Sequence, residues 1–153
     1  MTGLDTNAEW LAYARAHSDP AIRWLGGDAR MLPFADASFD HVLSIAALCF
    51  VDDERRAVAE IVRVAKRRFV VGWLNRNSLL YREKGRGGGS GAYRGAVWHT
   101  ELEARECFAG LPVRDLKLRF TTPAAVCSYC TGEIRIGNEY QMGTMKRMEF
   151  KKP

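Results

Sequence analysis

The fold is decided by residues 41–74, which read HVLSIAALCFVDDERRAVAEIVRVAKRRFVVGWL. Residues 41–47 are almost continuously apolar, which is typical of a strand buried on both faces. Asp52 and Asp53 then supply an N-cap for a helix. One face of that helix carries Val58, Ile61, Val62 and Ala65. Residues 69–74 again have the pattern of a buried strand, so the order strand, helix, strand predicts a parallel sheet with helices on its faces.

The same alternation continues towards the amino terminus. Residues 3–5 have the pattern of a strand end, and Thr6 and Glu9 have the spacing of a capping box that opens a helix. Residues 22–25 form a short apolar segment, closed by Gly26-Gly27-Asp28, that predicts a second strand. Together these elements predict an α/β fold with a mostly parallel sheet.

The pattern changes after Leu74. Residues 75–99 show no hydrophobic period and are rich in glycine and arginine, which predicts a long flexible loop. Thr100 and Glu103 repeat the capping-box spacing, and residues 113–120 resemble a half-exposed edge strand. We therefore expect one domain over residues 1–125, followed by a tail over residues 126–153 whose structure the pattern does not determine.

The composition is that of a globular protein. The chain has 153 residues, of which 47% are hydrophobic and 27% charged, and its formal net charge is +5. These values exclude collagen-like, disordered and disulfide-dense chains. No apolar run approaches the roughly 18 residues that a membrane span needs, so no membrane partner is expected. The first residues lack the basic and apolar regions of a secretory signal, and the resulting expectation is a cytoplasmic protein.

The four cysteines do not suggest a disulfide framework. Cys49 and Cys107 lie among apolar residues and are expected to be buried thiols. Cys127 and Cys130 have the spacing of half a zinc ribbon, but a structural zinc ion needs four ligands and no second pair follows. Cys107, His99 or a second chain could complete the ligand set and give a zinc-stabilised module. Two thiols in an edge hairpin are the favoured interpretation, so no metal site is assigned.

Two acidic residues follow strands at positions where α/β sheets bind nucleotides. Asp5 ends the first strand, where a carboxylate can accept hydrogen bonds from both ribose hydroxyls, although Asp5 could instead only cap the helix. Asp28 reaches the same edge, or is simply a turn residue. His99 is the one histidine to consider as a base, against the simpler interpretation of a solvent-facing or capping residue. The catalytic residue stays unassigned.

Three segments together resemble the class I S-adenosylmethionine-dependent methyltransferases, most closely the ubiquinone-biosynthesis-like (methyltransferase type 11) branch. These segments are GLDTNAEWLAYAR at 3–15, GDARMLPFADASFDHVLS at 27–44 and FVDDERRAVAEIVRVAKRRFVVGWLNRNS at 50–78. The resemblance covers residues 2 to about 120, and its most specific part is the Gly-Asp-Ala step at 27–29. It implies a Rossmann-like, doubly wound fold, and a transferase with S-adenosylmethionine as cofactor and a small-molecule methyl acceptor.

The resemblance also implies which residues form the cofactor site. By likeness to the family, Asp5 would bind the ribose, and Asp28 and Ala29 would bind the adenine. Ser44 and Ile45 would line the cavity for cofactor and acceptor. Methyl transfer from a sulfonium is an in-line displacement that depends mainly on positioning and exclusion of water, so the sequence need not show an acid or base.

One departure from the family pattern concerns its first strand and glycine-rich loop. They should lie about 20 residues before Asp5 and occupy the sheet between the strands near Asp5 and His41. Neither is found, so we expect an N-terminally truncated methyltransferase, inactive if it needs that loop. The alternative is a non-catalytic remnant that binds a protein or, less expectedly, nucleic acid through its basic loop and tail. Exposed strand edges favour association between copies of the chain.

Overall fold

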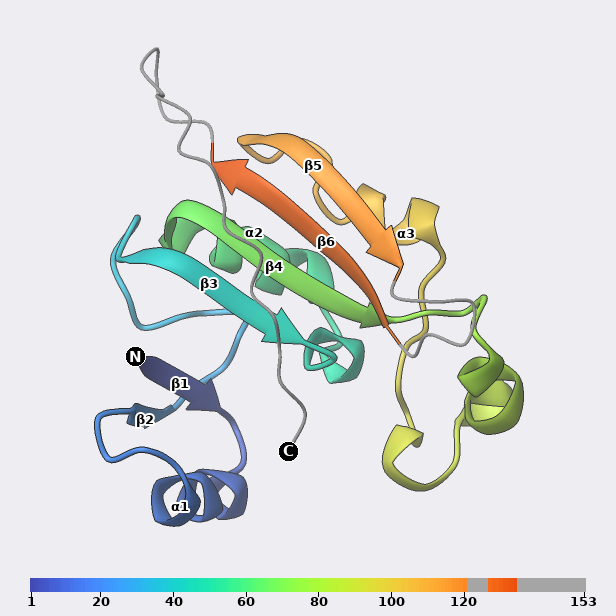
Figure 1. Cartoon of the computed structure of the whole chain (residues 1–153), viewed down its shortest axis with the longest axis horizontal. Coiled ribbons are helices and arrows are strands. Elements are labelled where there is room, and N and C mark those ends of the chain that lie inside the picture. The colour runs from blue at the N-terminus through green and yellow to red at the C-terminus, as the bar shows by residue number, and fades with distance from the viewer. Residues whose placement is uncertain (121–126, 135–153) are drawn as a thin grey trace.

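The computed structural model describes residues 1–120 and 127–134 and contains two sheets (Figure 1). The first sheet has two parallel strands, β1 (Thr2–Asp5) and β2 (Arg23–Gly26). The second has the order β3-β4-β6-β5, with β3 and β4 parallel and β6 antiparallel to both of its neighbours. Its strands are β3 (Phe39–Ile45), β4 (Ala65–Leu74), β5 (Val113–Phe120) and β6 (Cys127–Ile134). This mixed α/β arrangement confirms the predicted fold class.

The helices are α1 (Ala8–His17), α2 (Glu54–Val64) and α3 (Glu101–Glu106). Short helical turns follow β3 and β4, namely η1 (Leu48–Phe50), η2 (Tyr81–Gly85), η3 (Arg86–Gly88) and η4 (Gly91–Tyr93). None of the helices in residues 1–120 and 127–134 combines the length and the apolar character that crossing a bilayer requires.

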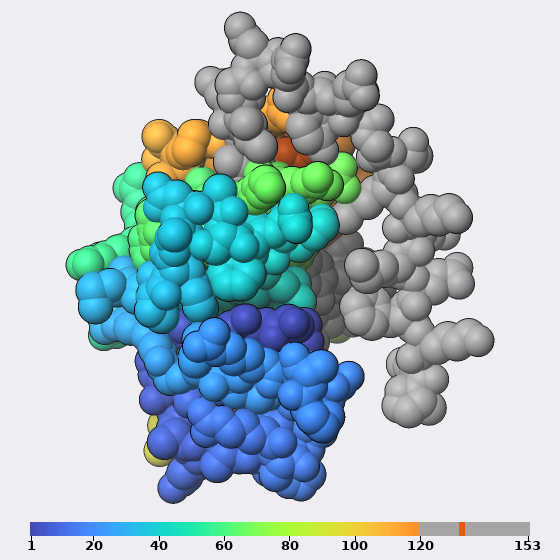
Figure 2. Space-filling view, turned by 90° about the vertical axis from the view of Figure 1, so that its left-hand side faces the viewer, coloured from blue at the N-terminus to red at the C-terminus, as the bar shows by residue number. Residues whose placement is uncertain are grey.

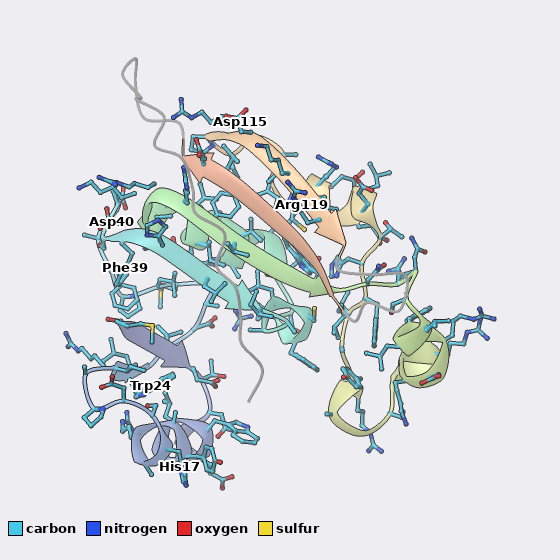
Figure 3. All side chains as sticks on the ribbon, viewed as in Figure 1. His17, Trp24, Phe39, Asp40, Asp115 and Arg119 are labelled. Carbon is cyan, nitrogen blue, oxygen red and sulfur yellow. The ribbon has the colours of Figure 1, made fainter. Side chains whose placement is uncertain are left out.

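Helix α1 packs beside β1 and β2 but begins differently from the prediction. Its N-cap is Asn7, whose side chain accepts hydrogen bonds from the backbone amides of Glu9 (2.8 Å) and Trp10 (3.0 Å), so the predicted Thr6 capping box is wrong. The Asp5 side chain accepts a hydrogen bond from the Asn7 amide, and this turn places the N-cap at Asn7, one residue after Thr6. Trp24 lies between the strands and α1 (Figure 3), against Gly3, where a β-carbon would collide with the indole ring.

Helix α2 forms as the sequence predicts. The Asp53 side chain caps it by accepting a hydrogen bond from the Arg56 amide (3.1 Å). The helix buries Ala57, Val58, Ile61, Val62 and Val64 in the core. Ala65, expected on the helix, begins β4 instead. The rings of Phe69 on β4 and Phe108 beyond α3 stack in the same core, with centroids 5.1 Å apart.

Strand β3 is not buried on both faces, and that prediction is wrong. Leu43 is 69% exposed and Ile45 is 42% exposed, whereas Val42 is half-buried and packs against the core. Among the described strands β3 pairs only with β4, and α2 covers only the face that carries Val42. A continuous apolar run indicates a strand, but it cannot show which neighbours cover that strand.

Strands β1 and β3 belong to different sheets, and no strand of the described residues joins them. The family resemblance places the family's first strand at this position. The arrows of β1, β3 and β4 nevertheless point the same way (Figure 1). Residues 1–27 gather in a mass below β3 in the side view (Figure 2). The carboxyl ends of the three strands thus face one side of the molecule.

Two segments that the sequence left irregular carry structure. Residues 75–99, expected to be a flexible loop, contain η2, η3 and η4. Residues 127–134, assigned to the tail, form β6 between β4 and β5. Strand β5 lies at the sheet edge, as its alternating pattern predicts. The rest of the predicted tail, residues 135–153, lies outside the described residues.

Candidate functional site at the carboxyl edge

The structure brings Asp5 and the Gly-Asp-Ala turn together at one sheet edge. In the parallel pairing of β1 with β2, Asp5 is opposite Gly26, and its carbonyl accepts a hydrogen bond from the Gly27 amide (3.0 Å). The Asp5 side chain is exposed, and its Oδ1 accepts the Asn7 amide at 2.8 Å. Asp28 follows this turn directly. The Asp5 side chain thus stabilises the turn that leads to the Asn7 cap of α1, and it also presents a carboxylate at the edge.

Asp28 is held by Arg30. The Arg30 backbone amide donates to Asp28 Oδ1 (2.8 Å), and the guanidinium donates Nη2 to Oδ2 (2.7 Å) and Nε to both oxygens (3.0 and 3.1 Å). These hydrogen bonds and the charge of Arg30 lower the pKa of Asp28 from 3.8 to about 2. Asp28 is therefore an ionised acceptor at any physiological pH. Arg30 is a residue that sequence reasoning did not single out.

Helix α2 clamps the segment that follows Asp28. Glu60 Oε2 accepts the Leu32 amide at 2.7 Å, and Arg56 Nε donates to the Arg30 carbonyl at 3.0 Å. Arg63 donates hydrogen bonds to Glu60, to Asp36 and to the carbonyls of Leu32 and Phe34. The Arg63 guanidinium also lowers the pKa of Glu60. In the sequence, the only signal of this clamp is the Glu60 and Arg63 spacing on one helical face.

The end of β3 contains a backbone feature that the sequence does not reveal. Ser44 is half-buried and Ile45 is exposed, and both precede Ala46, which has a positive φ of 54°. Its amide donates to the Gly72 carbonyl at 2.8 Å. A non-glycine residue in this region costs roughly 1 kcal/mol or more, and such strain is characteristic of functional sites. Alanine carries no sequence signal for it.

His99 is buried rather than solvent-facing or capping. It is 4% exposed, and its Nε2 lies 2.7 Å from Glu54 Oε1, while Thr100 is the N-cap of α3. Its Nδ1 has no hydrogen-bond partner among the described residues. The interpretations of His99 as a solvent-facing or as a capping residue are therefore both wrong, and its Nε2 is engaged by Glu54.

The predicted burial of Cys49 and Cys107 is confirmed. Burial and the nearby Glu54 carboxylate raise the pKa of the Cys107 thiol to about 12.

Other features lie away from this edge. A depression of about 470 Å³ is lined by Asp36, Ala37, Ala59, Val62, Arg63, Ala65, Lys66, Leu111 and Pro112. It lies where α2 ends and β4 begins, the opposite edge from Asp5 and Ile45. Within residues 1–120 and 127–134, no cluster of three or more metal-ligating side chains occurs. The side chains of Cys127 and Cys130 lie outside the described residues.

Comparison with known proteins finds sequence relatives of the first part of the chain. Residues 1–70 match the family described as "Methyltransferase domain". A phthiotriol/phenolphthiotriol dimycocerosates methyltransferase of Mycobacterium tuberculosis is 41% identical over 66 residues, 42% of this chain and 24% of that protein. The malonyl-[acyl-carrier protein] O-methyltransferase of Pectobacterium atrosepticum is 41% identical over 66 residues, 43% of this chain and 26% of that protein. The matched part spans about a quarter of the length of these relatives.

Solved structures show the same fold. A SAM-dependent methyltransferase from Thermotoga maritima superposes with a TM-score of 0.72 at 24% identity, covering 87% of this chain and 72% of that one. Magnesium protoporphyrin IX methyltransferase from Synechocystis with bound SAH gives a TM-score of 0.63 at 14% identity, covering 88% of this chain and 64% of that one. Residues 1–70 are therefore similar to the methyltransferase domain family, and the chain has the Rossmann-like fold seen in solved structures of S-adenosylmethionine-dependent methyltransferases.

Proposed function

We propose that the chain binds S-adenosylmethionine at the carboxyl edge of its parallel strands and functions in methyl transfer to a small molecule. The observation that carries the proposal is the pairing of β1 with β2, which sets Asp5 beside the Gly27-Asp28 turn inside the segment that matches the methyltransferase family. Carboxylates after neighbouring parallel strands are suited to bind the two ends of an adenosine group.

The residues present fit that cofactor. A ribose offers two hydroxyl donors, and Asp5 Oδ2 accepts no hydrogen bond from the described residues. An adenine amino group needs an acceptor, and Asp28 is ionised, with Ala29 beside it. When bound, the cofactor supplies an electrophilic methyl group on a sulfonium centre. Asp5 and Asp28 would hold the nucleoside, while Ser44 and Ile45 would border the site at the end of β3.

The contribution of the chain to the reaction would be positioning. Binding orients the methyl acceptor for in-line attack, and apolar side chains such as Ile45 exclude water from it. A base is needed only where the acceptor must lose a proton. His99 does not fit that role, because its Nε2 is bonded to Glu54 and its ring is buried.

The class of acceptor is proposed from the names of relatives. They include methyltransferases named for phthiotriol and phenolphthiotriol dimycocerosates, for malonyl-[acyl-carrier protein] and for demethylmenaquinone. These names support a small organic acceptor group for this chain. The same names give no support to the inactivity expected from the missing first strand and glycine-rich loop. Activity is therefore part of the proposal.

Calorimetric titration of the 153-residue chain with S-adenosylmethionine tests this proposal. Asp5→Asn and Asp28→Asn should each weaken binding by about tenfold or more, because each removes a charged acceptor from the site. Asp40→Asn is the matched control, since Asp40 lies at the amino end of β3, away from this edge (Figure 3). Its affinity should equal that of the wild type.

Two outcomes would contradict the proposal. One is unchanged affinity in both site variants. The other is a wild-type chain that melts cooperatively yet takes up no S-adenosylmethionine, which would favour the non-catalytic alternative.

A further inference from the structure

The segment from Asn75 to His99, here called the basic lobe, leaves the end of β4 and returns to it. Its two ends meet in a bridge between Asn75 and His99, where the His99 amide donates to the Leu74 carbonyl and the Arg76 amide to the His99 carbonyl, both at 2.9 Å. His99 is in turn held by Glu54 of α2. The base of the basic lobe is thus fastened at the carboxyl edge of the sheet (Figure 1).

The aromatic residues of the basic lobe form its interior. Trp98 is buried, with the rings of Tyr81 and Tyr93 at centroid distances of 5.3 and 5.7 Å. Gly85 is packed among them, and a β-carbon there would collide with Tyr81 and Trp98. These rings pack against one another, so they do not form a platform on which nucleic-acid bases could stack.

The outer surface of the basic lobe is cationic. Its exposed basic residues are Arg82, Lys84, Arg86 and Arg94, and the one exposed acid among them is Glu83. Within the described residues, none of these four cations forms an ion pair, whereas Arg76 at the base pairs with Glu103 at 2.9 Å. The outer part of the basic lobe therefore carries four cations that form no ion pair within the described residues, against one acid.

The basic lobe also exposes apolar side chains. Leu79 is 51% exposed and Val97 is 46% exposed. The Val97 amide donates to the Cys49 carbonyl at 2.7 Å, which brings Val97 close to Phe50, itself 51% exposed. Cations combined with exposed apolar side chains suit the boundary between lipid headgroups and acyl chains.

We propose that the basic lobe docks the protein on a membrane surface that contains anionic phospholipid. A specific protein partner needs a shaped surface, whereas the Gly87 to Gly91 tip offers almost no side chains and open space around Gly87, Gly88 and Gly91. A fluid anionic surface needs no such shape. Docking on a membrane surface does not require an apolar segment long enough to span the bilayer. The proposal does not depend on cofactor binding.

Vesicle sedimentation of the full chain tests the proposal. The protein should bind vesicles of phosphatidylcholine mixed with phosphatidylglycerol, should not bind pure phosphatidylcholine, and should be released by high salt. Each basic side chain near such a surface strengthens binding by about fivefold. The triple variant Arg82→Gln, Arg86→Gln, Arg94→Gln should therefore bind at least about tenfold more weakly.

A matched triple variant tests whether vesicle binding depends on where the cations lie or only on how many there are. Arg23→Gln, Lys66→Gln, Lys117→Gln removes the same net charge from exposed residues outside the basic lobe and should leave binding at the wild-type level. Thermal melts establish that both triples fold. Val97→Ser should weaken vesicle binding several-fold, because Val97 is proposed to enter the lipid boundary.

Three results would overturn the proposal. The first is equal loss of binding in the two triple variants, and the second is retained binding in the basic-lobe variant. The third is tight binding of a single-stranded oligonucleotide or of polyglutamate, lost in the basic-lobe variant, by a protein that does not bind the mixed vesicles. That result would assign the surface to nucleic acid or to an acidic protein instead.

Discussion

The carboxylate of Asp28, a candidate site residue, is oriented by a neighbouring side chain. The sequence places its carboxylate after the second strand, but it is Arg30 that fixes the orientation of both oxygens and holds its pKa at about 2. The same arginine occupies part of the acceptor capacity that an adenine amino group would use. In the proposed site, an adenine amino group would therefore compete with Arg30 for the Asp28 carboxylate.

The ionisation of Asp28 can be measured by carbon-detected NMR titration. Because its folded pKa lies below 3.8, the stabilisation from its pairing with Arg30 is fully present above about pH 4 and is lost as the pH falls through about 2. Arg30→Ala should move the midpoint up towards 3.8. A wild-type midpoint already near 3.8, unchanged by that substitution, would contradict the geometry.

At the scale of elements, α2 holds the segment after Asp28 against the larger sheet. Its inner face packs on β4, and its polar residues hold the segment after Asp28 through Glu60 and Arg63. The sequence predicts the helix and its Asp53 cap, because capping and hydrophobic period depend on residues within a few turns. The clamp pairs Arg63 with the carbonyl of Leu32, 31 residues earlier, so no local pattern reveals it.

Arg63→Ala should lower the free energy of unfolding by about 1–3 kcal/mol, because it leaves Glu60 and two carbonyls without charged donors. Urea unfolding followed by circular dichroism measures this change. The control is Arg67→Ala, which breaks a pair with Asp40 at 3.3 Å whose side chains are both 60% exposed. Its cost should be below about 1 kcal/mol. Equal effects of the two substitutions would show that the clamp does not stabilise the fold.

At the scale of the whole molecule, the core is unevenly distributed. The buried core cluster runs from Leu48 to Phe108 and includes no residue of β1, α1 or β2. Leu11 is the buried residue of α1 and lies outside that cluster. Residues 1–27, which carry Asp5, are therefore less firmly held by burial than β4.

Native-state hydrogen exchange should show this difference. Amides of β4 are expected to exchange most slowly, and those of α1 and β1 much faster, because opening residues 1–27 exposes little of the core. The exchange rates of the Ser44 and Leu43 backbone amides can be compared within β3. Because the Ala46 amide faces β4, alternation directs the Ser44 amide to β4 and the Leu43 amide to the open edge. Equal protection of α1 and β4 would indicate a single cooperative unit.

The sequence by itself determined the order of strands and helices from residue 2 to residue 120, the cap and buried face of α2, and the placement of Asp5 and Asp28 after strands. These features depend on neighbours along the chain, through capping bonds and hydrophobic period. Only the tertiary structure decided the exposure of β3, the insertion of β6, the engagement of His99 by Glu54 and the closed base of the basic lobe. Glu54 and His99 are 45 residues apart, and contacts at that separation depend on how whole elements pack, which no local pattern encodes.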